Sequence, residues 1–212
     1  MTQHKSVSLA DCVFQRLEND ILSGKYAYGD VLTESRLSEE LGVSRTPIRE
    51  AIRRLEQENI LRESGRGLVV QGITHEDVAD ILNIRLQIEG MAVRRAVTHM
   101  TDEEKRQLME AVELQEFYVS RQDPEHIQEQ DHQFHERIYA GCGSLTLQTT
   151  LVPLHRKAQK FRRASVERPE RAGESAAEHR AIAQAILDGD ADKAERLMVE
   201  HIGKAKLNMI GE

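Results

Sequence analysis

Two short amphipathic segments joined by a very tight turn constrain the fold of this 212-residue chain more than any other feature. The first segment, 34–41, can be capped by Thr33. Only Gly42-Val43 separates it from a second helix, which Ser44 or Thr46 can cap. The apolar positions of that second helix fall on one stripe: Ile48, Ala51, Ile52 and Leu55. Two helices connected in this way are typical of a helix-turn-helix.

The segments on either side complete a small domain. Apolar residues at four-residue spacing predict an earlier helix over 8–23. After the two central helices come two β-like runs, 60–63 and 68–70, with Ser64-Gly65-Arg66-Gly67 as the hairpin tip. A basic tip beside a recognition helix is suited to entering a DNA minor groove. We therefore expect a winged helix-turn-helix domain over 1–72.

The charge distribution is compatible with nucleic-acid binding, although the net charge is −7. Residues 1–72 hold 10 Lys/Arg against 11 Asp/Glu, and the remainder holds 19 against 25. Within 44–66 there are six Arg against four Glu. These arginines can contact phosphates or guanine edges from the start of a recognition helix. The alternative is a solvated, charged helix face, which is common in soluble proteins.

The remaining sequence, 73–212, has helical periodicity with few breakers. Six helices are predicted, over 75–99, 101–120, 124–140, 144–167, 174–188 and 191–209. Aromatic residues make up only 4% of the chain, which favours helices packed through aliphatic side chains. The expected fold class is mainly α, with a winged helix-turn-helix followed by an all-helical antiparallel bundle.

Four potential metal ligands are placed to converge inside this bundle. Asp131 and His135 are four residues apart and share one helix face. His179 and His201 flank the turn at Gly189, and their helix arms measure roughly 15 and 18 Å from it. An antiparallel hairpin would bring both imidazoles to nearly the same height. One carboxylate and three imidazoles suit a divalent zinc, nickel or manganese ion.

The other histidines are interpreted as surface or satisfied core residues. His132 is next to the candidate ligands but points about 100° away around its helix. The rest are set aside because a single helical histidine is seldom a ligand: His4, His75, His99, His126 and His155.

An arginine lies on an otherwise apolar stripe of the 75–99 segment. Arg85 occupies a position between Leu82 and Ile88 where an apolar side chain is expected. It can form an ion pair with Glu89, four residues on. Alternatively, its guanidinium faces the bundle interior and takes a carboxylate ligand in bidentate fashion. Arg162 and Arg163 are weaker candidates for the same role.

The N-terminal motif resembles a known family. Residues 37–56, LSEELGVSRTPIREAIRRLE, are similar to the winged-helix signature of the GntR family of bacterial regulators. The resemblance implies DNA contacts by residues of both helices and of the wing. The positions that match are Arg36, Arg45, Thr46, Arg49 and the wing glycines Gly65 and Gly67. Ser44, at the start of the recognition helix, and Arg66, at the hairpin tip, are added as candidate DNA contacts because of where they lie.

The C-terminal segment resembles the FCD effector domain of the FadR-type branch. The similarity rests on DHQFH at 131–135, EHRAI at 178–182 and Gly189-Asp190 leading to His201. It implies that Asp131, His135, His179 and His201 bind the metal and that Arg85 meets the effector. Six C-terminal helices are similar to the VanR-like group. A homodimer that binds an inverted-repeat operator is also implied.

These observations predict a DNA-binding transcription regulator, of repressor type, controlled by a small carboxylate effector at a metal site. One rival is a metal sensor, and another is a metal-dependent hydrolase fused to a DNA-binding module. We expect no enzyme activity, because no general base accompanies the candidate ligands. Cys12 and Cys142 form no CxxC pair, and no apolar run reaches the roughly 18 residues of a membrane span. A cytoplasmic protein that does not enter the membrane is therefore expected.

Overall fold

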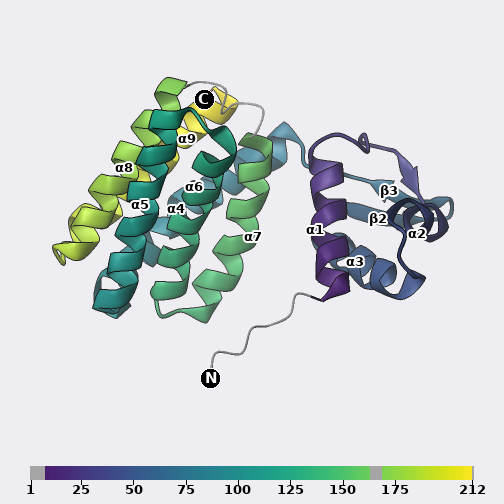
Figure 1. Ribbon diagram of the computed structural model, residues 1–212, viewed down its shortest axis with the longest axis horizontal. Helices are drawn as coiled ribbons and strands as arrows, with labels where there is room; N and C mark the ends of the chain where they lie inside the picture. The colour runs from purple at the N-terminus through teal and green to yellow at the C-terminus, as the bar shows by residue number, and fades with distance from the viewer. Residues whose placement is uncertain (1–7, 163–168, 212) are drawn as a thin grey trace. The chain divides into compact units, whose positions relative to one another are not determined.

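The computed structural model of the chain describes residues 8–162 and 169–211. It contains two compact units, the first ending at Thr74 and the second beginning at His75 (Figure 1). Arg163 lies outside the described residues, and the side chain of Arg162 is not described. In this part of the chain, no helix is both long and apolar enough to cross a membrane.

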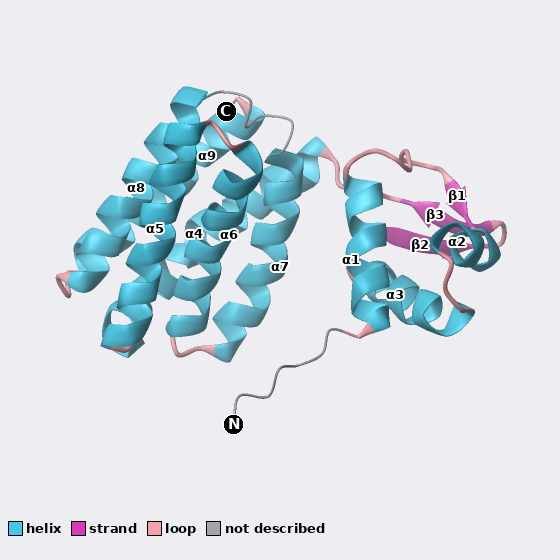
Figure 2. Ribbon diagram, in the orientation of Figure 1, coloured by secondary structure: helices cyan, strands magenta, loops and turns pink. Residues whose placement is uncertain are grey.

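The N-terminal unit combines three helices with a small antiparallel sheet (Figure 2). Its elements are α1 (Leu9–Leu22), β1 (Val31–Leu32), α2 (Glu34–Leu41), α3 (Arg45–Gln57), β2 (Leu61–Ser64) and β3 (Gly67–Val70). The strand order is β1-β3-β2, so β3 lies in the middle of the sheet. Phe14, Leu17, Ile48 and Leu55 are fully buried where α1 and α3 pack together. The predicted winged helix-turn-helix is confirmed.

Capping interactions fix the ends of these helices. The Thr33 hydroxyl accepts a hydrogen bond from the backbone N–H of Arg36, and Gly42 ends α2 at a φ of 65°. Ser44 does precede α3, but its side chain makes no capping hydrogen bond. Ser44 is thus the N-cap residue, one of the two that the sequence allowed, but its hydroxyl does not satisfy a backbone N–H of the first turn.

No sequence pattern predicts β1, which is only two residues long. Leu32 pairs with Leu68 of β3, and Val31 pairs with Val69. This third strand places Gly67 against β1: a Cβ at Gly67 would lie 2.7 Å from the carbonyl oxygen of Leu32. Gly67 also has a φ of 127°, a conformation that residues with side chains rarely adopt. The wing therefore requires glycine at this position for packing reasons.

The C-terminal unit is an all-helical bundle, as predicted (Figure 1). Its helices are α4 (His75–His99), α5 (Asp102–Arg121), α6 (Pro124–Gly141), α7 (Leu145–Arg162), α8 (Pro169–Leu187) and α9 (Ala191–Ile210). The helix α4 packs against α6, α7 and α9, and α5 packs against α6 and α8. The main departure from the predicted boundaries is that α8 begins at Pro169 rather than at 174.

The interior of this bundle is mostly apolar but contains one polar region. Phe134, Ile138, Ile182 and Met198 belong to the apolar core. Beside them lies a cluster of buried polar side chains from several helices: Arg85, Glu89, Gln115, Asp131, His135, His155, His179 and His201. Buried polar groups cost stability unless they are paired or bind a ligand, so this cluster is the candidate site.

Candidate metal centre and nucleic-acid interface

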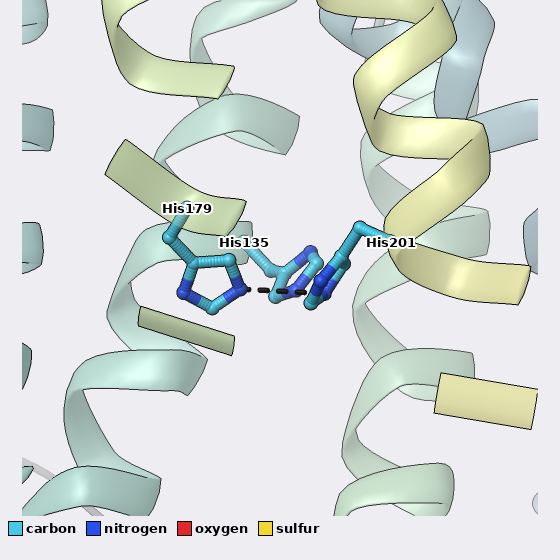
Figure 3. A group of neighbouring side chains, drawn as sticks. All are labelled: His135, His179 and His201. Atoms are coloured by element: carbon cyan, nitrogen blue, oxygen red, sulfur yellow. Dashed lines mark hydrogen bonds between the residues drawn. The ribbon is translucent and has the colours of Figure 1, made fainter. Parts of the chain in front are cut away.

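Three histidines from three helices meet in the C-terminal unit. His135 comes from α6, His179 from α8 and His201 from α9, and all three are buried (Figure 3). One ring nitrogen from each lies within 4.8 Å of the others. The Nε2 atoms of His179 and His201 are 3.3 Å apart. These distances bring three of the four predicted ligands together.

Each imidazole is oriented by a second contact at its other nitrogen. The Nδ1 atom of His179 is 2.7 Å from Oε1 of Gln115, and that of His201 is 2.7 Å from Oε2 of Glu178. The Nδ1 atom of His135 is 3.2 Å from a carboxylate oxygen of Glu89. Such partners set the tautomer and hold the ring in place, as they do for metal-binding histidines.

The residues present fit a divalent metal. Two nitrogens bound tetrahedrally to zinc at about 2.0–2.1 Å lie about 3.3 Å apart, which is the spacing of the Nε2 atoms of His179 and His201. Burial outweighs the nearby Glu178 carboxylate and lowers the pKa of His201 to about 4, so this ring is neutral near pH 7 and can act as a ligand. A cavity of about 470 Å³ between α8 and α9 is lined by His201 and Glu178.

Asp131 lies at the edge of the cluster. It is 2% exposed, and its Oδ1 atom is 3.9 Å from Nε2 of His179. Its Oδ2 atom is 3.9 Å from Nε2 of His155. The three histidines thus form the compact group, and the carboxylate of Asp131 stands beside them.

Arg85 forms the ion pair with Glu89 that the sequence allowed. Its Nε atom is 2.5 Å from Oε1 of Glu89, and both side chains are buried. Burial alone would raise the pKa of Glu89, but Arg85 and then His135 outweigh it and hold that pKa at about 2. The Glu89 carboxylate thus connects Arg85 to His135.

Sequence reasoning missed the contribution of α7, because it set His155 aside as a surface or satisfied core residue. His155 is 2% exposed, and its ring centroid is 4.5 Å from that of His135. It is thus a core residue of the polar cluster, but its ring nitrogens make no hydrogen bond to the described residues, so it is not the satisfied histidine that was expected. The available signal was helical spacing: Leu151, His155 and Ala158 share one buried face of α7.

Where they are described, the remaining histidines are surface or partly buried residues outside the three-histidine group, as the sequence analysis predicts. His75, His99 and His126 are exposed, and His4 lies outside the described residues. His132 is half-buried, with its Nε2 atom 3.2 Å from a carboxylate oxygen of Glu136.

The arginines of the N-terminal unit divide into two groups. Arg36, Arg45 and Arg49 are exposed, as are Ser44 and Thr46. Arg45 donates a hydrogen bond to Oγ of Ser35, and Arg49 donates from Nε to Glu34. These contacts hold two cations at the start of α3, on the side formed with α2.

Arg54 has a structural role instead. Its guanidinium lies 3.9 Å from the ring centroid of Phe14, and its Nη1 atom is 2.6 Å from a carboxylate oxygen of Asp11. Both partners belong to α1, so this arginine joins α3 to α1.

The wing presents its tip to solvent. Gly65 and Arg66 are exposed between the ends of β2 and β3, where Ser64 pairs with Gly67. The Ser64 hydroxyl accepts a hydrogen bond from the backbone N–H of Arg66 and donates one to the carbonyl of Gly67. The turn therefore displays one cation on a short, internally bonded hairpin.

A winged helix-turn-helix followed in one chain by a helical bundle with a buried polar cluster defines a class, the two-domain transcription regulators. Residues 9–70 match the bacterial regulatory proteins of the gntR family, and residues 80–204 match the FCD domain. The chain belongs to the GntR family of bacterial regulators, in the FadR-type branch that carries an FCD domain.

Similar proteins agree with this membership. The gluconate operon transcriptional repressor of Bacillus licheniformis is 35% identical over 118 residues, which are 56% of this chain and 49% of that protein. The match thus spans about half the length of that relative. The HTH-type transcriptional repressor GlaR of Escherichia coli is 28% identical over 89% of this chain and 90% of its own length.

A solved structure shows the same fold. E. coli McbR/YncC is 25% identical, with a TM-score of 0.78 over 94% of this chain and 95% of that chain. The matched families and the named relatives are regulators and not enzymes, as the sequence predicted.

Proposed function

We propose that this chain is a cytoplasmic DNA-binding transcription repressor whose operator affinity is controlled by a small organic acid. The acid binds beside a divalent metal ion in the C-terminal unit. The observation that carries the proposal is the buried group of His135, His179 and His201, in a chain that also contains a winged helix-turn-helix.

The metal would be held by the three histidines with Asp131 beside them. When bound, a zinc, nickel or manganese ion supplies a positive centre with coordination positions that an anionic ligand can fill. Gln115, Glu178 and Glu89 orient the three rings from the far side. Arg85 adds a buried positive charge, since Glu89 takes only its Nε atom and leaves the two terminal nitrogens outside that ion pair.

Operator DNA would be read by α3 and the wing. We propose that Ser44, Arg45, Thr46 and Arg49 enter the major groove, that Arg36 contacts the backbone, and that the 65–67 tip approaches the minor groove. Two chains in a two-fold dimer would place two recognition helices on the halves of an inverted repeat. The acid would alter DNA affinity through its different affinities for two arrangements of the dimer.

DNA binding is tested with an operator selected from a random duplex pool by the full-length protein. The double variant Arg45→Ala/Arg49→Ala should lose about 100-fold or more in affinity by fluorescence anisotropy, because each base or phosphate contact contributes about 1–3 kcal/mol. The matched control, Arg106→Ala/Arg196→Ala, removes two exposed charges from the helical unit and should bind as the wild type does. Equal binding by both double variants would defeat the assignment.

Ligand control is tested on the same DNA with metal-loaded and metal-free protein. Addition of small carboxylates to the loaded protein should change the dissociation constant for the operator, and should have no effect without metal. An operator affinity that follows the metal alone would instead favour the metal-sensor function.

A further inference from the structure

The polar cluster contains one side chain that the three-histidine group does not use. His155 of α7 is 2% exposed, and neither of its ring nitrogens has a hydrogen-bond partner among the described residues. A neutral imidazole carries one N–H donor and one acceptor, and burying both without partners costs stability. Such a position is expected where a ligand completes the hydrogen bonding.

The imidazole of His155 lies next to residues of the candidate metal centre. Its ring centroid is 4.5 Å from that of His135 and 6.1 Å from that of Tyr139. Its Nε2 atom lies 3.9 Å from a carboxylate oxygen of Asp131, which is too far for a hydrogen bond. His155 of α7 therefore lies beside His135 and Asp131 of the neighbouring helix α6.

A second polar side chain reaches the same region from α4. The Arg85 guanidinium pairs with Glu89, whose carboxylate also lies 3.2 Å from Nδ1 of His135, and the His135 ring is the one beside His155. The Nε atom of Arg85 is held by Glu89, which fixes the guanidinium in place. An anion bound in this cluster would be near a buried cation and near an imidazole that can donate a hydrogen bond.

We propose that His155 is a ligand-binding residue, whose imidazole hydrogen-bonds an oxygen of the organic acid between α4, α6 and α7. This inference rests on the proposed function, because it assigns a recognition residue to the same ligand. His155 is not one of the three histidines whose ring nitrogens lie within 4.8 Å of one another, and the role assigned to it is toward the acid rather than the ion. A leucine at this position would bury no unpartnered polar atoms, so a residue with a packing role alone has no need of an imidazole.

The test compares wild-type protein with His155→Leu and His155→Gln. Leucine removes both polar atoms, whereas glutamine keeps one donor and one acceptor. Nickel content is measured for each protein. Isothermal titration of the nickel-loaded wild type with acetate, lactate, malonate, succinate and malate then identifies the acid that binds most tightly. The melting temperature of each metal-free protein provides a readout that is independent of loading.

The expected result has three parts. All three proteins bind the same amount of nickel. His155→Leu binds the selected acid about 10- to 100-fold more weakly, as befits the loss of a hydrogen bond to a charged group, and His155→Gln recovers most of that loss. Metal-free His155→Leu melts at or above the wild-type temperature, because an unpaired buried polar group has been removed.

Three results would overturn the inference. Equal acid binding by wild type and His155→Leu would refute the recognition role alone and leave the proposed function intact. Loss of nickel from His155→Leu would show that the residue acts through the metal. If none of the acids binds the nickel-loaded wild type, the organic-acid part of the proposed function fails, and the role of His155 fails with it.

Discussion

At the scale of single residues, Glu178 connects the candidate metal centre to its surroundings. Its carboxylate accepts from Nδ1 of His201 at 2.7 Å, from both terminal nitrogens of Arg171 at 2.8 and 2.9 Å, and from Nζ of Lys204 at 3.1 Å. This set of contacts fixes the ring of His201 and increases its basicity as a ligand. Glu178 is therefore a positioning residue.

Replacing Glu178 by glutamine should weaken metal binding about 10- to 100-fold, because the negative charge behind His201 is lost while all three histidines remain. Competition with a coloured chelator measures the affinity. The control is Glu174→Gln on the same helix, where the glutamate side chain is 65% exposed and lies 3.5 Å from Nη1 of Arg171. The positioning role would be wrong if the two variants retained zinc equally well.

Part of the candidate site can be predicted from residue spacing along the sequence, and part depends on how the helices pack. The separation of His179 and His201 from Gly189 is a property of one helical hairpin, so their proximity can be derived from helix geometry. Gln115 and His155 lie on α5 and α7, and their approach to the histidines depends on how helices distant in sequence pair. Periodicity identifies the buried face of a helix but not its neighbour across the core.

At the scale of elements, the wing depends on the two-residue strand β1. Gly67→Ala should lower the free energy of unfolding of the N-terminal unit by about 1–3 kcal/mol, because the new Cβ would meet the carbonyl of Leu32 at a φ that alanine avoids. Urea denaturation followed by circular dichroism measures the loss. Gly65→Ala is the matched control, since a Cβ there meets open space. Equal stability of the two variants would contradict this account of the wing.

In the pair formed by α2 and α3, a carboxylate of the protein occupies an arginine that is proposed to contact DNA. Glu34 holds the Nε atom of Arg49 at 2.9 Å, on an exposed surface. A DNA phosphate that binds Arg49 must displace the Glu34 carboxylate or bind the guanidinium alongside it. Removing the charge of Glu34 in Glu34→Gln should therefore tighten binding to non-specific duplex DNA several-fold. Anisotropy titrations over a range of salt concentrations measure the change. Glu50→Gln, an exposed carboxylate next in sequence to Arg49, is the control, and a smaller effect of Glu34→Gln than of this control would argue against the competition.

The elements themselves were largely predictable because their ends carry local signals. As expected, α2 begins after Thr33, whose side chain caps it, and ends at Gly42, which adopts a left-handed conformation. Local signals fail where tertiary contacts decide. The strand β1 exists because Leu32 pairs with Leu68, and two residues carry no periodicity. Likewise, no helical period marks the first turn of α8, which begins at Pro169.

At the scale of the whole molecule, the proposed repressor joins a DNA-binding unit to a sensing unit that has its own polar interior. If an acid changes operator affinity by some factor, the operator must change acid affinity by the same factor. The two units therefore have to be studied in the full chain. The metal centre is the feature on which the sensing half of the proposal depends.

The most direct test is the metal content of untagged protein purified without chelators. The account predicts about one zinc, nickel or manganese ion per chain, and almost none in the His179→Ala/His201→Ala variant, since two of the three clustered imidazoles are then missing. His75→Ala/His126→Ala, which removes two exposed histidines, should keep the full amount. Wild-type protein that is folded and binds DNA but contains no metal, and takes up none when it is supplied, would contradict the proposed centre.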